Sequence, residues 1–373
     1  MPSFDLAIVG AGIVGLAHAL AAVRRGKRVV VIDRDAQANG ASIRNFGFVT
    51  VTGQERGATW RRAMRSRDVW CEIAGAARIT IEQSGFVLLG RRPEARSVLE
   101  AFMATEMGQD CTLVEPRDAE RRWPGLHPES CAAALFSPHE RRVESRDAVP
   151  KLAAWLAEAH GVTFMRGVAV RAVDPPRVST SRGEVSAEAV VVCPGDDLQT
   201  LFPDRIAQYG VTRCKLQMLR VAPPAAGFRL GGAVMTDLSL VRYLGYAALP
   251  EAAPLRRRLE AEQPDHLANG VHLIVVQSSD GSLVIGDSHH YAPTPDPFGR
   301  DDVDALILDE YTRTVAPEPP RVLERWTGTY ASAEGPMFMD RPADRVRLVM
   351  VTSGTGASTG FAIGEETLAD LYD

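Results

Sequence analysis

The sequence predicts an α/β fold, α+β overall, in which a mostly parallel sheet is joined to a second, largely antiparallel sheet. Three observations predict this fold. A strand–helix–strand pattern opens the chain, a further buried strand ends in glycine at residue 195, and alternating apolar runs fill much of the sequence between. At 373 residues the chain is longer than a single core usually supports, so we expect two domains.

The composition is that of an ordinary globular protein and excludes several classes of protein. Hydrophobic residues make up 45% and charged residues 24% of the chain. The net charge of −5 gives no basic excess that would indicate a nucleic-acid partner. The five cysteines are scattered without a CxxC pair, which argues against a disulfide scaffold and a cysteine metal site. The apolar start lacks the positive flank of a signal peptide and no other run is long enough for a membrane span, so we expect a cytoplasmic protein without a membrane partner.

The first 33 residues carry the clearest pattern. Residues 4–9 read as a buried strand, residues 13–25 as a helix and residues 27–33 as a second, parallel strand. Basic residues in the last turn and Gly26 as the stop are typical of a helix end. The chain therefore opens with a strand–helix–strand unit.

The turn between the first strand and the helix has the spacing G-x-G-x-x-G. Gly10 permits a tight turn, Gly12 lets a pyrophosphate approach the backbone, and Gly15 lets the helix pack closely on the strand. The helix amino terminus offers unpaired N–H groups to phosphates, and Asp33 can accept hydrogen bonds from a ribose hydroxyl. The strand before the turn, the helix after it and the acidic residue Asp33 all match the dinucleotide-binding motif. This segment therefore predicts a Rossmann-like dinucleotide-binding domain.

A polar loop bounded by glycines, residues 40–48, follows the second strand and is suited to lie against a flat ligand. Together the runs Gly10-Ala-Gly-Ile-Val-Gly15, Asp33-Arg34 and Ala41-Ser-Ile-Arg-Asn-Phe-Gly47 resemble the FAD-binding start of the D-amino-acid oxidase and glycine oxidase family. The resemblance extends along nearly the whole chain and is sharp only at its two ends. It implies FAD as the cofactor.

A middle segment extends the resemblance. Residues 145–160 have helical periodicity, and residues 188–195 read as a buried parallel strand that ends in Gly195. The resemblance implies that Val168 contacts the adenine and that the Gly195 turn faces the cofactor.

The carboxy-terminal segment also extends the resemblance to this family. A strand over 347–352 feeds a polar loop with three glycines, residues 353–360, and a helix over 361–371. A polar loop before a helix amino terminus is an anion site, and the resemblance implies that it approaches the flavin pyrimidine ring. No cysteine lies near this loop, so we expect FAD to be held non-covalently.

We expect a discontinuous FAD-binding domain of residues 1–79, 141–215 and 328–373, and a substrate-binding domain of residues 80–140 and 216–327. Alternating runs in the latter indicate an antiparallel sheet. The residues expected to hold FAD are Gly10, Gly12, Ile13, Val14, Gly15, Asp33, Arg34, Ser42, Arg44, Asn45, Phe46, Gly47, Val168, Gly195, Gly354, Thr355, Gly356, Ser358, Thr359 and Gly360.

The reaction follows from the resemblance. Only one G-x-G-x-x-G motif is present, so a separate NAD(P)H domain is missing. The resemblance implies that the substrate donates a hydride to the flavin from the C–H beside an amine nitrogen. Positioning the free-base amine supplies most of the catalysis, and the imine then hydrolyses to a carbonyl compound and ammonia or an amine. We expect O2 or an electron carrier as acceptor, with an oxidase favoured; the oligomeric state stays open.

The substrate-binding run departs from the family pattern. Relatives that act on α-amino acids often carry tryptophan–x–glycine–x–arginine–proline, whose arginine holds the carboxylate, whereas this chain has Trp326-Thr-Gly-Thr-Tyr330-Ala. The string Gly286-Asp-Ser-His-His-Tyr291, with Arg213-Cys-Lys215, instead resembles a branch of the family associated with aminophosphonate breakdown. A phosphonate has more oxygens and charge than a carboxylate and suits a cluster of donors. We therefore expect oxidative deamination of a small amine, an aminophosphonate in the first place.

Seven residues are candidates for contact with the substrate. Those expected to bind its anion are Arg213, Arg242, Tyr243 and His290, and those expected to take part in catalysis are Lys215, His289 and Tyr330. Because neighbouring residues on a strand point to opposite faces, His289 and His290 are a poor metal site, and we expect no metal. Some flavin oxidases of the family that this chain resembles use a lysine over the ring to help oxygen react, and among the three lysines we expect Lys215 to take this role.

Three other interpretations stay open at this point. The chain can be a glycine or D-amino-acid oxidase that holds its carboxylate differently, an FAD-dependent 2-hydroxyacid dehydrogenase, or a flavin-binding protein without turnover. Bleaching of the flavin by substrate without air separates an enzyme from the last of these.

Overall fold

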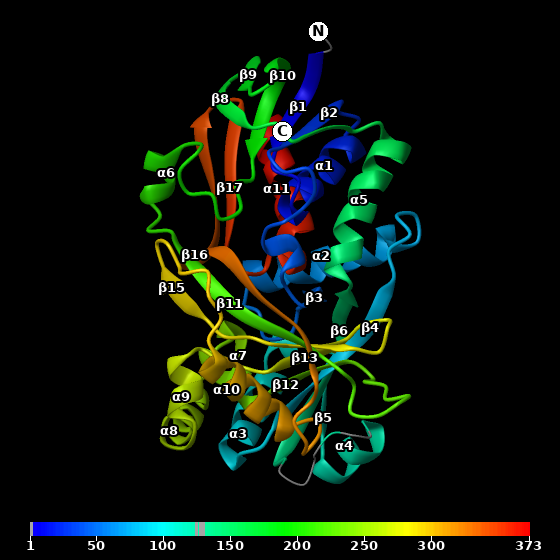
Figure 1. Cartoon of the computed structure of the whole chain (residues 1–373), viewed down its shortest axis with the longest axis vertical. Coiled ribbons are helices and arrows are strands. Elements are labelled where there is room, and N and C mark those ends of the chain that lie inside the picture. Colours follow the sequence, from blue (N-terminus) through cyan, green and yellow to red (C-terminus); the bar gives the residue numbers. More distant parts are fainter. Residues whose placement is uncertain (1–2, 124–125, 127–130) are drawn as a thin grey trace.

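The computed structural model describes residues 3–123, 126 and 131–373, and both ends of the chain lie in the same half of the molecule (Figure 1). The α-helices are α1 (Ile13–Arg24), α2 (Ala58–Ala74), α3 (Pro93–Met103), α4 (Pro116–Arg122), α5 (Ser145–His160), α6 (Pro203–Ala207), α7 (Leu244–Ala247), α8 (Ala252–Glu262), α9 (Pro264–Ala268), α10 (Asp301–Thr312) and α11 (Gly356–Tyr372). Short 3-10 helices are η1 (Ala41–Ile43), η2 (Glu106–Gly108) and η4 (Asp237–Val241).

The strands are β1 (Ser3–Val9), β2 (Val29–Asp33), β3 (Phe48–Val49), β4 (Ile81–Gly90), β5 (Thr112–Val114), β6 (Ala133–Val143), β7 (Thr163–Arg166), β8 (Val170–Asp174), β9 (Arg177–Thr180), β10 (Gly183–Val192), β11 (Thr212–Val221), β12 (Ala233–Thr236), β13 (Ile274–Gln277), β14 (Leu283–Gly286), β15 (His290–Ala292), β16 (Val322–Ala343) and β17 (Val346–Ser353). The mixed α/β fold expected from the sequence is confirmed.

The predicted parallel sheet has the strand order β7–β2–β1–β10–β17. Val9 at the end of β1 pairs with Ile32 on one side and with Val192 on the other, so three strands end at the same edge. The expected strands over 4–9 and 27–33 are confirmed as β1 and β2, and β10 begins earlier than the sequence indicated. The common edge is where ligands bind in sheets of this kind.

Helices cover this sheet and complete its core. In Figure 1, α1 and α11 lie side by side, and Gly364 permits their contact because a Cβ there would lie 2.9 Å from the Ala17 carbonyl oxygen. Helix α5 packs on α1 and has the bounds expected from the sequence, whereas α11 begins at Gly356, before the predicted residue 361. No helix in the described part of the chain is both long and apolar enough to cross a bilayer.

The second sheet has the order β16–β11–β14–β13–β12–β4–β6 and is antiparallel except between β12 and β4. Helices α3 and α10 pack on this sheet and α8 packs on α3, and the sequence analysis had not predicted these three helices. Their apolar residues recur at four-residue spacing, as Leu255 and Leu259 in α8 and Val303, Ile307 and Tyr311 in α10, and all five are buried. The spacing is helical, but it was obscured by the prolines and charges around it.

Two long strands connect the sheets. β11 pairs with β16 along its whole length, and β16 continues into the other half to pair with β17. The expected domain boundaries at 140/141, 215/216 and 327/328 therefore fall inside β6, β11 and β16. The division into two domains stays a prediction.

Gly47 gives a prediction about stability. Its φ is +67°, and a Cβ there would lie 1.7 Å from the Val143 carbonyl oxygen, so no other residue fits without backbone movement. Gly26 is the matched control, because its φ is +71° and a Cβ there would meet nothing within 4 Å. Gly26→Ala should lower the free energy of unfolding by about 1–2 kcal/mol from the left-handed backbone alone.

Gly47→Ala should cost about 3 kcal/mol or more, because overpacking adds to the same backbone cost. Urea unfolding of the two variants and the parent, all without flavin, measures the difference. Equal losses in the two variants would contradict the steric explanation.

Candidate active site

Two adjoining cavities lie at the common strand edge of the parallel sheet and extend toward α11 and β11. Their volumes are about 450 Å³ and about 190 Å³. Five residues line both cavities, so the two form one elongated space: Gly12, Ala41, Ser42, Cys193 and Gly195. Spaces of this size at the ends of parallel strands are the usual ligand sites of such folds.

The glycine turn admits no side chain. A Cβ on Gly15 would lie 1.9 Å from the Gly10 carbonyl oxygen, and one on Gly12 would lie 2.9 Å from Ser42 Oγ. Helix α1 has no side-chain cap at Gly12, although Ser42 Oγ accepts a hydrogen bond of 2.9 Å from Ile13 N. The start of α1 is therefore open toward the cavity, as a site for phosphate requires.

The smaller cavity is lined by seven residues predicted to hold the cofactor: Gly10, Gly12, Asp33, Arg34, Ser42, Val168 and Gly195. Asp33 Oδ2 accepts a hydrogen bond from Ala11 N at 2.6 Å, and Oδ1 accepts one from Asp35 N at 2.8 Å. Each oxygen keeps a second lone pair for a ribose hydroxyl. Arg34 is paired with Asp197 at 2.7 Å, which directs its guanidinium along the cavity wall.

The larger cavity is lined by the start of α11 and the loop before it. Gly354, Thr355, Gly356 and Ser358 all face it, and α11 has no side-chain cap at Thr355. A Cβ on Gly354 would lie 3.2 Å from the Tyr330 ring, so this tyrosine packs directly on the loop. The helix amino terminus is again open to a negatively charged group.

Among the other residues expected at the cofactor, Ile13, Val14, Ser42, Arg44, Asn45 and Phe46 line the larger cavity. The structure does not bring Gly47, Thr359 and Gly360 to either cavity. Gly47 lies against Val143 as described above. The Thr359 hydroxyl donates to the Thr355 carbonyl oxygen at 3.0 Å, and Gly360 faces Ala17 of α1. These three positions shape the loops and helix contacts that surround the cavity.

A guanidinium and three phenols gather at the far end of the larger cavity, which we call the substrate end: Arg242, Tyr243, Tyr291 and Tyr330. Arg242 follows η4 and its Nη2 donates to the Tyr291 hydroxyl oxygen at 3.2 Å. Burial alone lowers the pKa of Arg242, but Tyr291, Tyr330 and Asp287 raise it overall, so the group stays a cation. Burial raises the pKa of Tyr243 and of Tyr330, which keeps both phenols protonated and able to donate.

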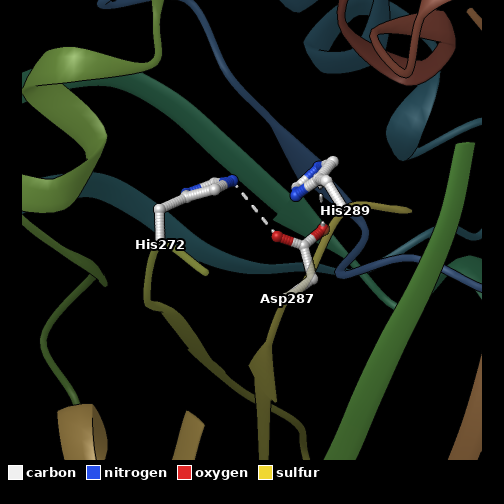
Figure 2. A group of neighbouring side chains, drawn as sticks. All are labelled: His272, Asp287 and His289. Carbon is white, nitrogen blue, oxygen red and sulfur yellow. Dashed lines mark ion pairs between the residues drawn. The ribbon is translucent and has the colours of Figure 1, made fainter. Parts of the chain in front are cut away.

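His272, Asp287 and His289 form a cluster beside them, and Figure 2 shows the Asp287 carboxylate between the two imidazoles. Asp287 Oδ1 lies 3.1 Å from His272 Nε2, and Oδ2 lies 3.8 Å from His289 Nε2. All three line the larger cavity, and their exposed fractions are only 3%, 5% and 7%. His289 Nδ1 donates to the Gly270 carbonyl oxygen at 2.9 Å, which turns Nε2 toward the carboxylate.

Burial sets the charges of this cluster. It lowers the pKa of His289 to about 3 and lowers that of His272, so both imidazoles are neutral at physiological pH. Burial alone would raise the pKa of Asp287, but the contact with His272 and the positive charge of Arg242 lower it overall. The cluster therefore presents one carboxylate and two neutral imidazoles.

Three of the expected residues point away from the cavity: Arg213, Lys215 and His290. Lys215 Nζ donates to Asp296 Oδ2 at 2.8 Å and to the Phe298 carbonyl oxygen at 3.0 Å. The Arg213 guanidinium donates to the carbonyl oxygens of Asp196 and Pro293, and His290 Nε2 lies 3.0 Å from Asn269 Oδ1.

The physical reason is strand alternation. Leu216 lines the cavity, so its neighbour Lys215 faces the other side of β11. The structure thus does not place Lys215 where it would meet oxygen over the flavin ring. His289 and His290 do lie on opposite faces as expected, but His272 and Asp287 supply the partners for His289 that the sequence analysis had missed.

The fold and this site define a dinucleotide-binding protein. FAD fits the residues present, because two uncapped helix amino termini and a glycine turn that admits no Cβ open on one elongated space. Those elements would hold the phosphates and the ring, and Asp33 would hold the ribose.

Comparison with known proteins identifies the family. The family model described as "DAO: FAD dependent oxidoreductase" matches residues 5–371, so the chain belongs to this family and is an FAD-dependent oxidoreductase. The FAD cofactor and the resemblance to the D-amino-acid oxidase and glycine oxidase family are confirmed, whereas the branch associated with aminophosphonate breakdown stays a prediction. No curated protein matches the sequence.

Several solved structures share the fold. Glycine oxidase from Bacillus cereus ATCC 14579 has a TM-score of 0.78 at 17% identity, over 99% of this chain and 94% of that one. L-proline dehydrogenase from P. horikoshii has a TM-score of 0.77 at 18% identity, over 98% and 92%. L-α-glycerophosphate oxidase from Mycoplasma pneumoniae, with FAD bound, has a TM-score of 0.75 at 14% identity, over 100% and 95%.

Asp33 gives a prediction about FAD affinity. Hydrogen bonds that the ribose hydroxyls donate to a charged carboxylate are worth about 1.5–3 kcal/mol, so Asp33→Ala should weaken FAD binding by about 10–150-fold. Titration of the flavin-free protein with FAD, followed by quenching of flavin fluorescence, gives the dissociation constant. Asp174→Ala, which removes an exposed carboxylate from β8, controls for the change in charge and should bind FAD as the parent does. An Asp33→Ala variant with unchanged affinity would contradict the assignment.

Proposed function

We propose that this FAD-dependent oxidoreductase oxidatively deaminates a small amine that carries a phosphonate group. The observation that carries the proposal is the set of donors at the substrate end of the cavity. One guanidinium, that of Arg242, lies among the phenols of Tyr243, Tyr291 and Tyr330, with two imidazoles beside them. This set suits an anion with several oxygen acceptors.

The count of donors favours a phosphonate over a carboxylate. A carboxylate has two oxygens, which one guanidinium can satisfy through a bidentate pair. A phosphonate has three oxygens and a larger charge. Its additional oxygen could accept hydrogen bonds from the protonated phenols, which a carboxylate held by the guanidinium could not. Tyr330 occupies the place where relatives that act on α-amino acids often have arginine, which also supports a different anion.

Names of similar structures support an amine as the reacting group. Glycine oxidase, L-proline dehydrogenase and iminodiacetate oxidase from Chelativorans sp. BNC1 are each named for an amine that also carries an acid group. An amino-acid substrate held by Arg242 is therefore the second candidate, and the experiment below separates the two.

The chemistry assigned to the chain is positioning. When bound, FAD supplies the acceptor for a hydride. Arg242 and the phenols would hold the anion, so that the carbon beside the amine nitrogen is directed toward Tyr330 and the Gly354 loop. The carbon loses a hydride and the nitrogen loses a proton, which gives an imine. Water then adds to the imine and releases a carbonyl compound and ammonia.

Anaerobic reduction of the flavin tests this function. Aminophosphonates, amino acids and 2-hydroxy acids are each mixed with the FAD-loaded protein without oxygen, and the flavin absorbance is followed. We expect aminophosphonates to reduce the flavin faster than the other compounds at the same substrate concentration. Reduction by glycine or a D-amino acid alone would overturn the phosphonate assignment in favour of the second candidate.

Arg242 tests the same assignment through one side chain. Arg242→Met removes a charge-assisted pair worth about 3 kcal/mol, so the substrate concentration for half-maximal flavin reduction should rise by about 100-fold. Arg213→Met is the matched control, because Arg213 lines neither cavity and its guanidinium donates to the carbonyl oxygens of Asp196 and Pro293. If both variants behave alike, Arg242 does not hold the substrate.

Lys215 gives a prediction of the opposite kind. Its ammonium is held by Asp296 and the Phe298 carbonyl on the far face of β11, so Lys215→Met should change neither anaerobic reduction nor reoxidation by air. A slower reoxidation with normal reduction would restore the role expected from the sequence.

The same reoxidation trace identifies the acceptor. Rapid recovery in air with peroxide marks an oxidase, and recovery only after an electron carrier is added marks a dehydrogenase.

A further inference from the structure

We propose that His272, Asp287 and His289 form a binding site for a divalent transition-metal ion, zinc in the first place, at the substrate end of the cavity (Figure 2). Two imidazoles and one carboxylate are the ligand set of many zinc sites that keep a position open for a further ligand. The metal binding stands on the geometry of the three residues. The role given to the ion below rests also on the proposed function.

The spacing of the ligand atoms fits such an ion. One atom from each residue lies within 4.8 Å of the others, and the carboxylate oxygens lie 3.1 Å and 3.8 Å from the two Nε2 atoms. With metal–ligand bonds of about 2.0–2.2 Å, neighbouring ligands of a tetrahedral site are about 3.3–3.6 Å apart. The observed distances bracket this range, so small side-chain rotations would close the site.

The outer contacts orient both imidazoles inward. His289 Nδ1 donates to the Gly270 carbonyl oxygen at 2.9 Å, and His272 Nδ1 lies 3.4 Å from Ser239 Oγ. Each Nε2 is thereby left to face Asp287. Metal-binding histidines usually have their second ring nitrogen held in this way, because the contact fixes the ring and directs the lone pair.

One carboxylate oxygen of Asp287 lacks a well-formed hydrogen bond in the described part of the chain. Its Oδ1 is buried and makes no hydrogen bond of acceptable geometry there, although His272 Nε2 is 3.1 Å away. A buried carboxylate oxygen without a partner is costly. A cation shared with the two imidazoles would remove that cost.

The open coordination position gives the ion a role in substrate binding. Three protein ligands leave a fourth position open, and Arg242 lines the same cavity as the three ligands. A phosphonate oxygen is a suitable fourth ligand, and its remaining oxygens could accept from Arg242 and the phenols. The charge of the anion would also balance the ion beside a guanidinium. The ion would then help the site choose a phosphonate over a carboxylate.

Zinc binding by the FAD-loaded protein tests the site. The protein is dialysed against dipicolinate and then against chelator-free buffer, and zinc is titrated in by calorimetry. We expect one zinc per chain. Because loss of an outer contact alone costs about 10–100-fold in affinity, loss of a ligand in Asp287→Asn, His272→Gln or His289→Gln should cost at least about 100-fold.

His290→Gln is the matched control, since His290 is the next residue in the chain but lies on the other face, beside Asn269. It should bind zinc as the parent does. The absorbance of bound flavin confirms that each variant is folded. If Asp287→Asn loses its flavin, the two histidine variants decide. The site is overturned if the parent binds zinc no tighter than the three variants, or if His290→Gln loses binding as they do.

Methylphosphonate, which has no amine and cannot be oxidised in the proposed reaction, tests the role of the ion. Its binding is followed through the flavin spectrum with and without zinc, and we expect it to be at least about tenfold tighter with zinc. Equal affinity would overturn the role in phosphonate binding. If zinc binds with the expected variant pattern while no aminophosphonate reduces the flavin, the metal site stands and the proposed function fails.

Discussion

The alternation of side chains along β11 and its paired strands decides which residues reach the cavity. Cys214 pairs with Tyr330 on one side and Tyr291 on the other, so the two phenols stand in one row facing the same space. One residue along, Lys215 pairs with His290, and that row faces away. Strand β16 continues into the other half of the molecule and pairs there with β17. The register between β11 and β16 therefore also determines where Tyr330 contacts the loop before α11. A shift of one residue would exchange the two rows and replace phenols by an ammonium and an imidazole.

A second constraint is the placement of opposite charges at the substrate end. Arg242 and Asp287 both line the larger cavity, and each shifts the pKa of the other toward its charged form. Neither imidazole beside them carries charge, since burial lowers the pKa of both. The substrate end of the cavity can therefore bind an anion at the guanidinium and a cation at the carboxylate. The two bound charges offset each other, so the net buried charge does not change.

The sequence predicted the cofactor end well because its signals are local. The turn from Gly10 to Gly15, with Asp33 at the next strand end, lies in one short segment, and its spacing alone indicates the ligand. The substrate end is not local. His272 and Asp287 are fifteen positions apart and meet only because β13 pairs with β14. The sequence does not indicate which alternate residues of β11 face the cavity. Neither the apolar pattern of the strand nor its charges show on which side Lys215 lies. The one signal that was present is the run of polar residues directly after the buried strand β14, which marks a strand end that enters a cavity.

The two ends of the cavity also differ in what they are made of. The cofactor end uses backbone N–H groups and positions where a Cβ would clash, as at Gly15, so its chemistry is tied to the fold. The substrate end uses side chains from the residues after η4, before β13 and after β14, and from β15 and β16. Any one of these can be exchanged while the sheet and the cofactor turn stay intact. Membership of the FAD-dependent oxidoreductase family therefore carries the flavin chemistry to this chain, whereas in the proposed function the choice of substrate depends on the phenols, Arg242 and the His272–Asp287–His289 cluster.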